Sequence, residues 1–314
     1  MPTFKRYTPD NIHQWNDFVK TSKNGFFMFD RAYMDYHADR FADHSLMVFD
    51  EGGSLVAVLP ANERDGVLYT HQGLTFGGFI VGRKMRTPLM LEVMEGLKAY
   101  AKTEGFTKVV YKAIPHFYHQ QPAQEDLYAL FRQGAKQVRV DVSSTIDYTT
   151  KRYKFSSSRK SGLVKAKKEG LTVQAGLDFT AFFGMMNEVL AEKYDTQATH
   201  TAGEMTKLHT SFPNNIKGFA CTRGNELLAG AIVYETETVA HTQYLAATEE
   251  GRSVGALDLL LKRLIDEVYT DKNYFDFGIS TEQAGQYLNE GLIDQKEGTG
   301  ARATIHQVYE LECK

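Results

Sequence analysis

Two stretches of the chain share one outline, and this repetition decides the fold. Residues 81–115 read "VGRKMRTPLMLEVMEGLKAYAKTEGFTKVVYKAIP", and residues 250–280 read "EGRSVGALDLLLKRLIDEVYTDKNYFDFGIS". Each stretch has Gly-Arg, a loop, an amphipathic helix and then an apolar strand. A supersecondary pattern that recurs within one chain predicts two copies of the same α/β unit.

The spacing of apolar residues places the helix and the strand of each copy. We expect helices over 88–103 and 254–269, because both ranges carry apolar side chains at helical intervals. Pro88 suits the first turn of the earlier helix. Strands are predicted over 107–115, which ends at Pro115, and over 273–280, where Phe275, Phe277 and Ile279 alternate to one side.

Three further strands precede the helix in each copy. Short turns rich in glycine join the first two strands of each set, which therefore read as hairpins. The predicted fold class is α/β, with two tandem units that each have a mixed, mostly antiparallel sheet flanked by helices. Serines and charges cluster near 148–155, so we expect domains at 1–150 and 151–314. The predicted meander strands are 45–50, 54–60 and 66–70, and then 217–222, 226–234 and 238–247.

Bulk properties indicate an ordinary globular protein. The 314 residues favour two domains, and 42% are hydrophobic and 24% charged. The net charge of −3 argues against a chain built as a whole to hold a polyanion. No signal peptide or membrane span is read, so we expect a cytoplasmic protein. Cys221 and Cys313 lack metal-ligand spacing, as do the histidines at 37, 44 and 71, so we expect reduced thiols and no metal.

Three motifs, together with the repeat, carry a resemblance to a known family. They are "SSSRKSGLVKAKKEGLTV" (156–173), "YFDFGISTE" (274–282) and "LIDQKEGTGARA" (292–303). Their order resembles the FemAB-like branch of the GNAT acyltransferases, whose members have two such units in tandem. This branch includes ligases that build peptidoglycan interpeptide bridges. The resemblance implies an acyltransferase that acts on an amine of a small metabolite or cell-envelope precursor, and its motifs are individually of low specificity.

The resemblance also implies a site for the acyl donor. GNAT proteins bind the pyrophosphate of coenzyme A with backbone N–H groups where the central helix opens, as helix N-termini bind anions generally. Here "RSVGAL" matches only in part, because Leu257 stands where a small residue is expected. A helix start with a glycine for tight packing is the structural alternative. The implied site for acetyl-coenzyme A or another acyl-coenzyme A consists of Arg252, Ser253, Val254, Gly255 and Ala256.

Four residues are candidates for the chemistry. The resemblance places Lys296 at the transfer centre, where a cation stabilises the developing oxyanion. Glu282 and Glu297 are candidate general bases. The alternative for Glu282 is a first-turn acid of a following helix capped by Ser280 or Thr281, and we favour that interpretation. Tyr244 is either a proton donor and pocket residue or a half-buried strand tyrosine.

Substrate-binding candidates lie in both halves. His71, Gln72 and Thr75 belong to a stretch, 70–78, that loosely resembles the glycine-rich loop over the acceptor groove. Asp276 should face away from Phe275 and Phe277, toward a cleft or toward solvent. Arg302 lies in the glycine-rich turn that follows Lys296. The substrate-binding candidates are thus His71, Gln72, Thr75, Asp276 and Arg302.

A basic segment allows more than one kind of acyl donor. Residues 151–170 hold eight Lys or Arg against one acid, Glu169. Binding of RNA phosphates is one interpretation, and a solvated helix docked through Leu163 and Ala166 is the other. An aminoacyl-tRNA donor is therefore the first alternative to acyl-coenzyme A. A catalytically inactive binding module of the same fold is the second.

Overall fold

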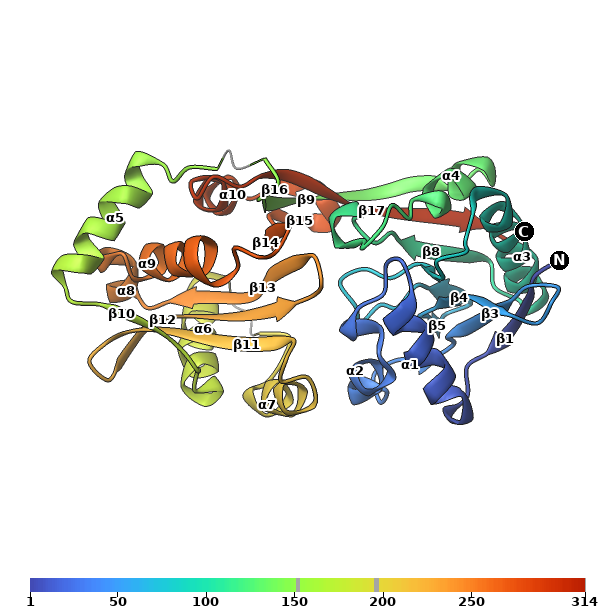
Figure 1. Cartoon of the computed structure of the whole chain (residues 1–314), viewed down its shortest axis with the longest axis horizontal. Coiled ribbons are helices and arrows are strands. Elements are labelled where there is room, and N and C mark those ends of the chain that lie inside the picture. Colours follow the sequence, from blue (N-terminus) through green and yellow to red (C-terminus); the bar gives the residue numbers. More distant parts are fainter. Residues whose placement is uncertain (151–152, 195–197, 314) are drawn as a thin grey trace. The chain divides into compact units, whose positions relative to one another are not determined.

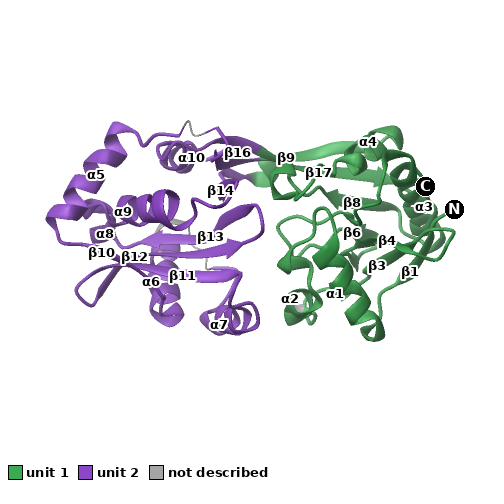
Figure 2. Ribbon diagram, viewed as in Figure 1, with its two compact units in different colours: residues 1–141, 283–286, 305–314 green, residues 142–282, 287–304 purple. Residues whose placement is uncertain are grey.

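The computed structural model describes residues 1–150, 153–194 and 198–313 and divides into two compact units. Unit 1 contains residues 1–141, 283–286 and 305–314, and unit 2 contains residues 142–282 and 287–304 (Figure 2). This division differs from the predicted ranges 1–150 and 151–314. Strands β9 (Lys136–Asp147) and β17 (Arg302–Glu312) are each continuous and contribute residues to both units. The boundary between residues 141 and 142 lies within β9, and a boundary inside a strand has no change of composition by which the sequence could reveal it.

Unit 2 is built on a mixed sheet in the order β10–β11–β12–β13–β14–β9. Neighbouring strands are antiparallel except β13 and β14, which are parallel. The predicted three-stranded meander is confirmed. Its strands are β11 (Ile216–Arg223), β12 (Glu226–Glu235) and β13 (Val239–Ala247), flanked by β10 (Thr172–Ala175) and β14 (Tyr274–Ile279).

Helices cover both faces of this sheet. Figure 1 shows α9 on one face and α6 on the other. Apolar side chains of β14 and α9, such as Phe275, Phe277 and Leu260, are buried together. The helices of unit 2 are α5 (Ser157–Lys168), α6 (Phe179–Tyr194), α7 (Ala202–Ser211), α8 (Glu249–Val254), α9 (Ala256–Arg263), a π-helical turn (Leu264–Val268) and α10 (Glu290–Glu297).

The predicted helix over 254–269 is interrupted at its start. Gly255 has φ 80°, caps α8 and separates it from α9. A Cβ at this position would lie 2.2 Å from the carbonyl oxygen of Gly162 in α5. A glycine is therefore required for both the left-handed backbone and the close approach of α5.

Helix α5 contains most of the basic segment. Ala166 is buried and Leu163 is half-buried against the core of unit 2, which agrees with the interpretation of this segment as a docked helix. Arg159 pairs with Asp258 of α9 at 2.7 Å. The first two residues of the segment, Lys151 and Arg152, lie outside the described residues.

Unit 1 repeats the arrangement with a divided sheet. One part has the order β17–β8–β6–β5–β2, and the other has β1–β3–β4–β7. Strands β6 and β8 are parallel, like β13 and β14 of unit 2. The bounds are β1 (Thr3–Arg6), β2 (Ala42–Asp43), β3 (Leu46–Phe49), β4 (Leu55–Leu59), β5 (Asn62–Arg64), β6 (Val67–Tyr69), β7 (Ile80–Val81) and β8 (Lys108–Lys112).

The helices of unit 1 include the predicted one. The range expected as 88–103 is α3 (Thr87–Thr103), and the hairpin of β3 and β4 is confirmed. The other helices are α1 (Ile12–Thr21), α2 (Arg31–Met34) and α4 (Glu125–Arg132), with 3-10 turns at Pro9–Asn11, Phe27–Phe29, Asp35–His37, His116–Tyr118 and, from the segment 283–286, Gln283–Gly285.

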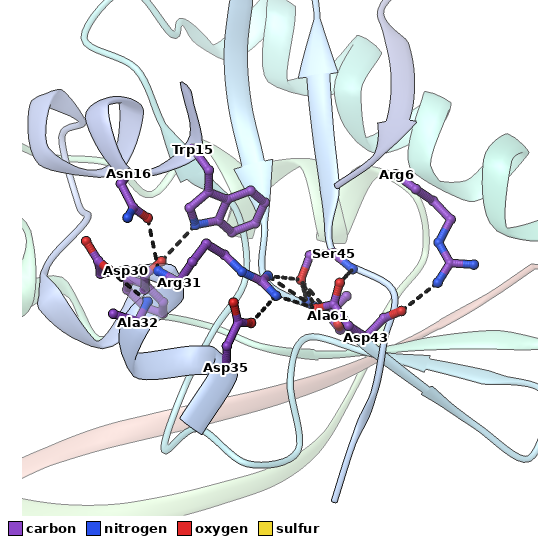
Figure 3. Close-up of polar contacts among 11 residues, drawn as sticks. Arg6, Trp15, Asn16, Asp30, Arg31, Ala32, Asp35, Asp43, Ser45 and Ala61 are labelled. Carbon is purple, nitrogen blue, oxygen red and sulfur yellow. Dashed lines mark hydrogen bonds and ion pairs between the residues drawn. The ribbon is translucent and has the colours of Figure 1, made fainter. Parts of the chain in front are cut away.

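A buried arginine ties α2 to the sheet of unit 1 (Figure 3). Arg31 is 3% exposed, and its guanidinium lies 3.9 Å from the ring centroid of Tyr7. Its Nη1 donates to Asp43 Oδ1 at 3.2 Å and to Ser45 Oγ at 3.1 Å, while Nη2 pairs with Asp35. The charge is thus matched by carboxylates, as a buried cation requires.

Within the ranges that the structure covers, no helix combines the length and apolar character needed to cross a lipid bilayer.

Candidate active site

The two parallel strands of unit 2 separate along their length. Their paired residues run from Val239 with Tyr274 to His241 with Asp276, and the pairing ends there. The next part of β13 carries a bulge at Gln243, because Ile232 pairs with Tyr244 while Val233 pairs with Thr242. A bulge bends its strand away from the regular path. Residues 242–247 are therefore not paired with β14, and they line the same space as residues of α9 and α10.

A pocket of about 620 Å³ occupies this opening. Its walls come from β13, α6, α9 and α10. Four residues that separate sequence motifs had singled out lie around it: Tyr244, Arg252, Glu282 and Lys296. The fold thus brings together side chains from a strand, a helix start, a turn and a late helix.

Lys296 is the central polar group of the pocket. It belongs to α10, is 7% exposed and donates from Nζ to the carbonyl oxygens of Gly278 at 2.8 Å and Ile279 at 2.7 Å. Burial lowers its pKa to about 8, although the carboxylate of Asp276 acts in the opposite direction. The ammonium form has three N–H donors, so one donor is left for a bound molecule.

Asp276 lies behind the pocket rather than in it. Its side chain faces away from Phe275 and Phe277, as predicted, but it is 0% exposed. Oδ2 lies 2.7 Å from His241 Nδ1, and Oδ1 accepts from Ser143 Oγ at 2.7 Å and from the Gly278 N–H at 3.2 Å. The expected cleft or solvent position is therefore wrong, because the neighbouring strands supply partners that enclose the carboxylate.

His241 was missed by the sequence reasoning. It is a histidine in the strand "TVAHTQYLAA", and the alternation of that strand gives no reason to single it out. Only the parallel register of β13 with β14 places it opposite Asp276.

Tyr244 contributes a hydroxyl to the pocket wall. Its OH lies 2.5 Å from His200 Nδ1 and accepts from the His200 N–H at 3.2 Å. Burial raises the pKa of Tyr244 to about 12, so the hydroxyl stays protonated near neutral pH. Both the pocket and the strand interpretations of this residue therefore apply.

Glu282 does not begin a helix, so the favoured capping interpretation is wrong. Thr281 and Glu282 form β15 (Thr281–Glu282), which pairs with β16 (Tyr287–Leu288). Positive φ at Gln283 and Ala284 turns the chain back at once. Helix α10 starts later, behind the cap Asn289, whose Nδ2 donates to Glu282 Oε1 at 2.9 Å. Glu282 itself is exposed and lines the pocket.

The segment Arg252–Ala256 does not form the expected open loop. Residues 249–254 are α-helical, and the N–H groups of Gly251, Arg252 and Gly255 already donate to Thr248 Oγ1, Thr248 O and Arg252 O. Ala256 is fully buried. The Arg252 guanidinium donates to Ala247 O at 2.8 Å and borders the pocket, whereas Ser253 is exposed on the surface. The structural alternative, a glycine for tight packing, fits Gly255.

Two other candidates of unit 2 do not border the pocket within the part of the chain that the structure describes. Glu297 is half-buried at the end of α10. Arg302 is exposed at the start of β17, and its Nη1 donates to Ala301 O at 2.6 Å.

The three acceptor candidates belong to unit 1. His71 is buried with φ 64°. Gln72 is held by Asn62, which donates from Nδ2 to Gln72 Oε1 at 2.9 Å and accepts the Gln72 N–H at 2.7 Å. Thr75 is exposed. Over the described ranges, no three His, Cys, Asp or Glu side chains are grouped so that they could hold a metal ion.

Solved structures with the same architecture cover nearly the whole chain, although no protein-family model and no curated sequence matches it. FemX has 11% identity and a TM-score of 0.64 over 97% of this chain and 96% of its own. L-PGS from Bacillus licheniformis has 11% identity and a TM-score of 0.61 over 99% and 93%. A tandem GNAT protein from the clavulanic acid biosynthesis pathway has 13% identity and a TM-score of 0.52 over 100% and 99%. The chain therefore has the tandem GNAT fold of the FemAB-like kind.

Proposed function

We propose that unit 2 is an acyltransferase. It moves an acyl group from an activated ester or thioester to an amine of a small metabolite or cell-envelope precursor. The observation that carries the proposal is the buried, doubly hydrogen-bonded Lys296 in the opening between β13 and β14. A cation held in a fixed position and shielded from water is suited to stabilise a negative charge that develops during reaction.

The pocket offers separate places for the parts of a donor. Leu257 and Leu261 of α9 and Met186 of α6 form apolar walls that suit an acyl chain. Arg252 at the border suits a phosphate of the leaving group. Transfer then joins the amine nitrogen to the carbonyl carbon and breaks the bond from that carbon to the oxygen or sulfur of the leaving group.

Two donor classes suit this pocket, and the backbone contacts of α8 favour one of them. An acyl-coenzyme A needs free N–H groups for its pyrophosphate, but α8 uses those of Gly251, Arg252 and Gly255. Two acids in the first turn of α8, Glu249 and Glu250, further disfavour an anion there. These contacts favour an aminoacyl-tRNA donor over an acyl-coenzyme A.

Helix α5 adds to the case for an RNA-linked donor. It lies against the start of α9, and Lys160, Lys165, Lys167 and Lys168 are exposed on it. Such a row of ammonium groups suits the phosphates of an acceptor stem. FemX and the C-terminal domain of a protein described as a putative lysylphosphatidylglycerol synthetase share the fold, as does the clavulanic acid pathway protein whose structure was determined without AcCoA.

The test is a pair of binding titrations followed by transfer assays. The purified chain is titrated with acetyl-coenzyme A, desulfo-coenzyme A and a charged tRNA mixture at several salt concentrations. Arg252→Ala should weaken binding of the true donor at least tenfold, whereas Arg263→Ala should not. Arg263 is the matched control because it is exposed on α9 and pairs with Glu267 outside the pocket.

Each outcome has a distinct meaning. Binding of charged tRNA that falls steeply with salt supports the aminoacyl ester, and micromolar binding of both coenzyme A compounds supports the thioester. Transfer to amine acceptors is then followed by mass spectrometry. Lys296→Met should reduce turnover at least a hundredfold. Binding without any turnover, unchanged in Lys296→Met, would instead indicate the inactive binding module.

A further inference from the structure

We propose that His241 is the general base of the transfer reaction and that Asp276 is the residue that positions it. This inference rests on the proposed acyltransferase function. His241 lies on β13, and no sequence motif identified it.

The carboxylate of Asp276 fixes the histidine ring. Asp276 is 0% exposed and His241 is 8% exposed, and Oδ2 lies 2.7 Å from Nδ1. A buried carboxylate without a proton can only accept, so Nδ1 carries the hydrogen and donates it. The neutral ring must then have an unprotonated Nε2, which is the form that a proton acceptor needs.

The remaining partners of Asp276 support the same form of the ring. Oδ1 accepts from Ser143 Oγ at 2.7 Å and from the Gly278 N–H at 3.2 Å. Hydrogen bonds donated to a carboxylate favour its charged form. Among the described residues no hydrogen bond to His241 Nε2 is present, so this nitrogen is available.

Gly278 borders both the histidine and Lys296, although of these two only Lys296 lines the pocket. Its carbonyl oxygen accepts from Lys296 Nζ at 2.8 Å, and a Cβ placed on it would lie 3.3 Å from His241 Cε1. The imidazole and the ammonium therefore lie beside one residue, Gly278, at the end of β14. One group can take a proton while the other stabilises the oxyanion.

The reaction balances with these two groups. An uncharged acceptor amine forms its bond to the acyl carbon, and the carbonyl oxygen becomes an oxyanion beside Lys296. His241 Nε2 takes a proton from the amine nitrogen, and the resulting imidazolium stays bonded to Asp276 through Nδ1–H. When the oxyanion collapses, the bond to the leaving oxygen or sulfur breaks and the imidazolium returns the proton to it. The enzyme ends in its starting state.

The first measurement is independent of turnover. With ¹⁵N-labelled imidazole rings, NMR of the chain across a pH series should show the neutral His241 ring protonated at Nδ1. Asp276→Asn should allow the neutral form protonated at Nε2 to appear, because an amide can donate to Nδ1 as well as accept from it. A neutral wild-type ring protonated at Nε2 would overturn the inference.

The second measurement uses the donor and acceptor found in the transfer assay. In His241→Asn the amide nitrogen can replace Nδ1 toward Asp276, but no group replaces Nε2. We expect a fall in turnover of about 10²-fold or more, since a general base contributes roughly 10²–10⁴-fold, with donor affinity unchanged. Added imidazole should restore part of the activity of His241→Gly.

The control is His209→Asn on α7. His209 Nδ1 also makes a local bond, at 2.7 Å, but its partner is the backbone oxygen of Ile216 and not a carboxylate. Turnover in His241→Asn within threefold of the control would overturn the inference while the proposed function stands. Absence of transfer by the wild-type chain with both donors would be the failure of the proposed function instead.

Discussion

A substitution at Gly255 can distinguish a structural role from an anion-binding role for the segment that joins α8 to α9. The perturbation is Gly255→Ala. Its φ of 80° lies in the left-handed region, where an L-residue with a Cβ costs about 1–2 kcal/mol. The new Cβ would also lie 2.2 Å from Gly162 O and 2.7 Å from Gly162 C, both backbone atoms of α5. Forcing such a contact apart costs about 1–3 kcal/mol more.

The expected loss of unfolding free energy is therefore about 2–5 kcal/mol in unit 2. Gly224→Ala is the matched control, because Gly224 has φ 58° and a Cβ there would meet nothing within 4 Å. It should lose only the backbone part, about 1–2 kcal/mol. The difference between the two variants isolates the contact with α5.

The assay is urea unfolding followed by far-UV circular dichroism. The one tryptophan, Trp15, belongs to unit 1, so its fluorescence reports that unit separately. Hydrogen exchange of α5 and α9 amides locates the loss within unit 2. Equal stability of the two variants, together with lost donor binding in Gly255→Ala alone, would refute the packing argument and restore an anion-binding role for this glycine.

Two further substitutions test buried charges. Lys296→Met should change the pH dependence of stability. The pKa of Lys296 is about 8 in the folded chain and ordinarily 10.5, so between these pH values the unfolded chain binds one more proton than the folded chain. From pH 8 to 10.5, the unfolding free energy of the wild type should therefore rise by about 3 kcal/mol relative to that of Lys296→Met, as measured by urea titrations. The same pH dependence in both proteins would contradict the burial of Lys296. Arg31→Met should lower the stability of unit 1 by about 1–3 kcal/mol, because Asp43 and the buried Ser45 lose a hydrogen-bond donor while the Asp43 carboxylate stays 32% exposed to water. Trp15 fluorescence measures this loss, and Arg64→Met, at an exposed pair with Asp65, should change it by less than about 1 kcal/mol.

The sequence determined the secondary structure of the repeat because that information is local. The period of apolar residues identified α3 and the strands of both meanders, and the glycine turns identified the hairpins. Lys296 and Tyr244 were also identified from the sequence as candidates, because the order of the motifs along the chain can be read without a structure. Docking of α5 through Ala166 followed from its apolar positions.

Tertiary structure decided what depends on distant segments. The partnership of His241 with Asp276 exists only because β13 and β14 pair in one register, and the two residues are 35 positions apart. Gly255 is required by the approach of Gly162, which lies far away in the sequence. Glu282 resembled a helix cap because acids and hydroxyls near a polar stretch have the same local pattern in a cap and in a short hairpin. Which of these forms depends on the turn at Gln283 and Ala284 and on the chain that receives it.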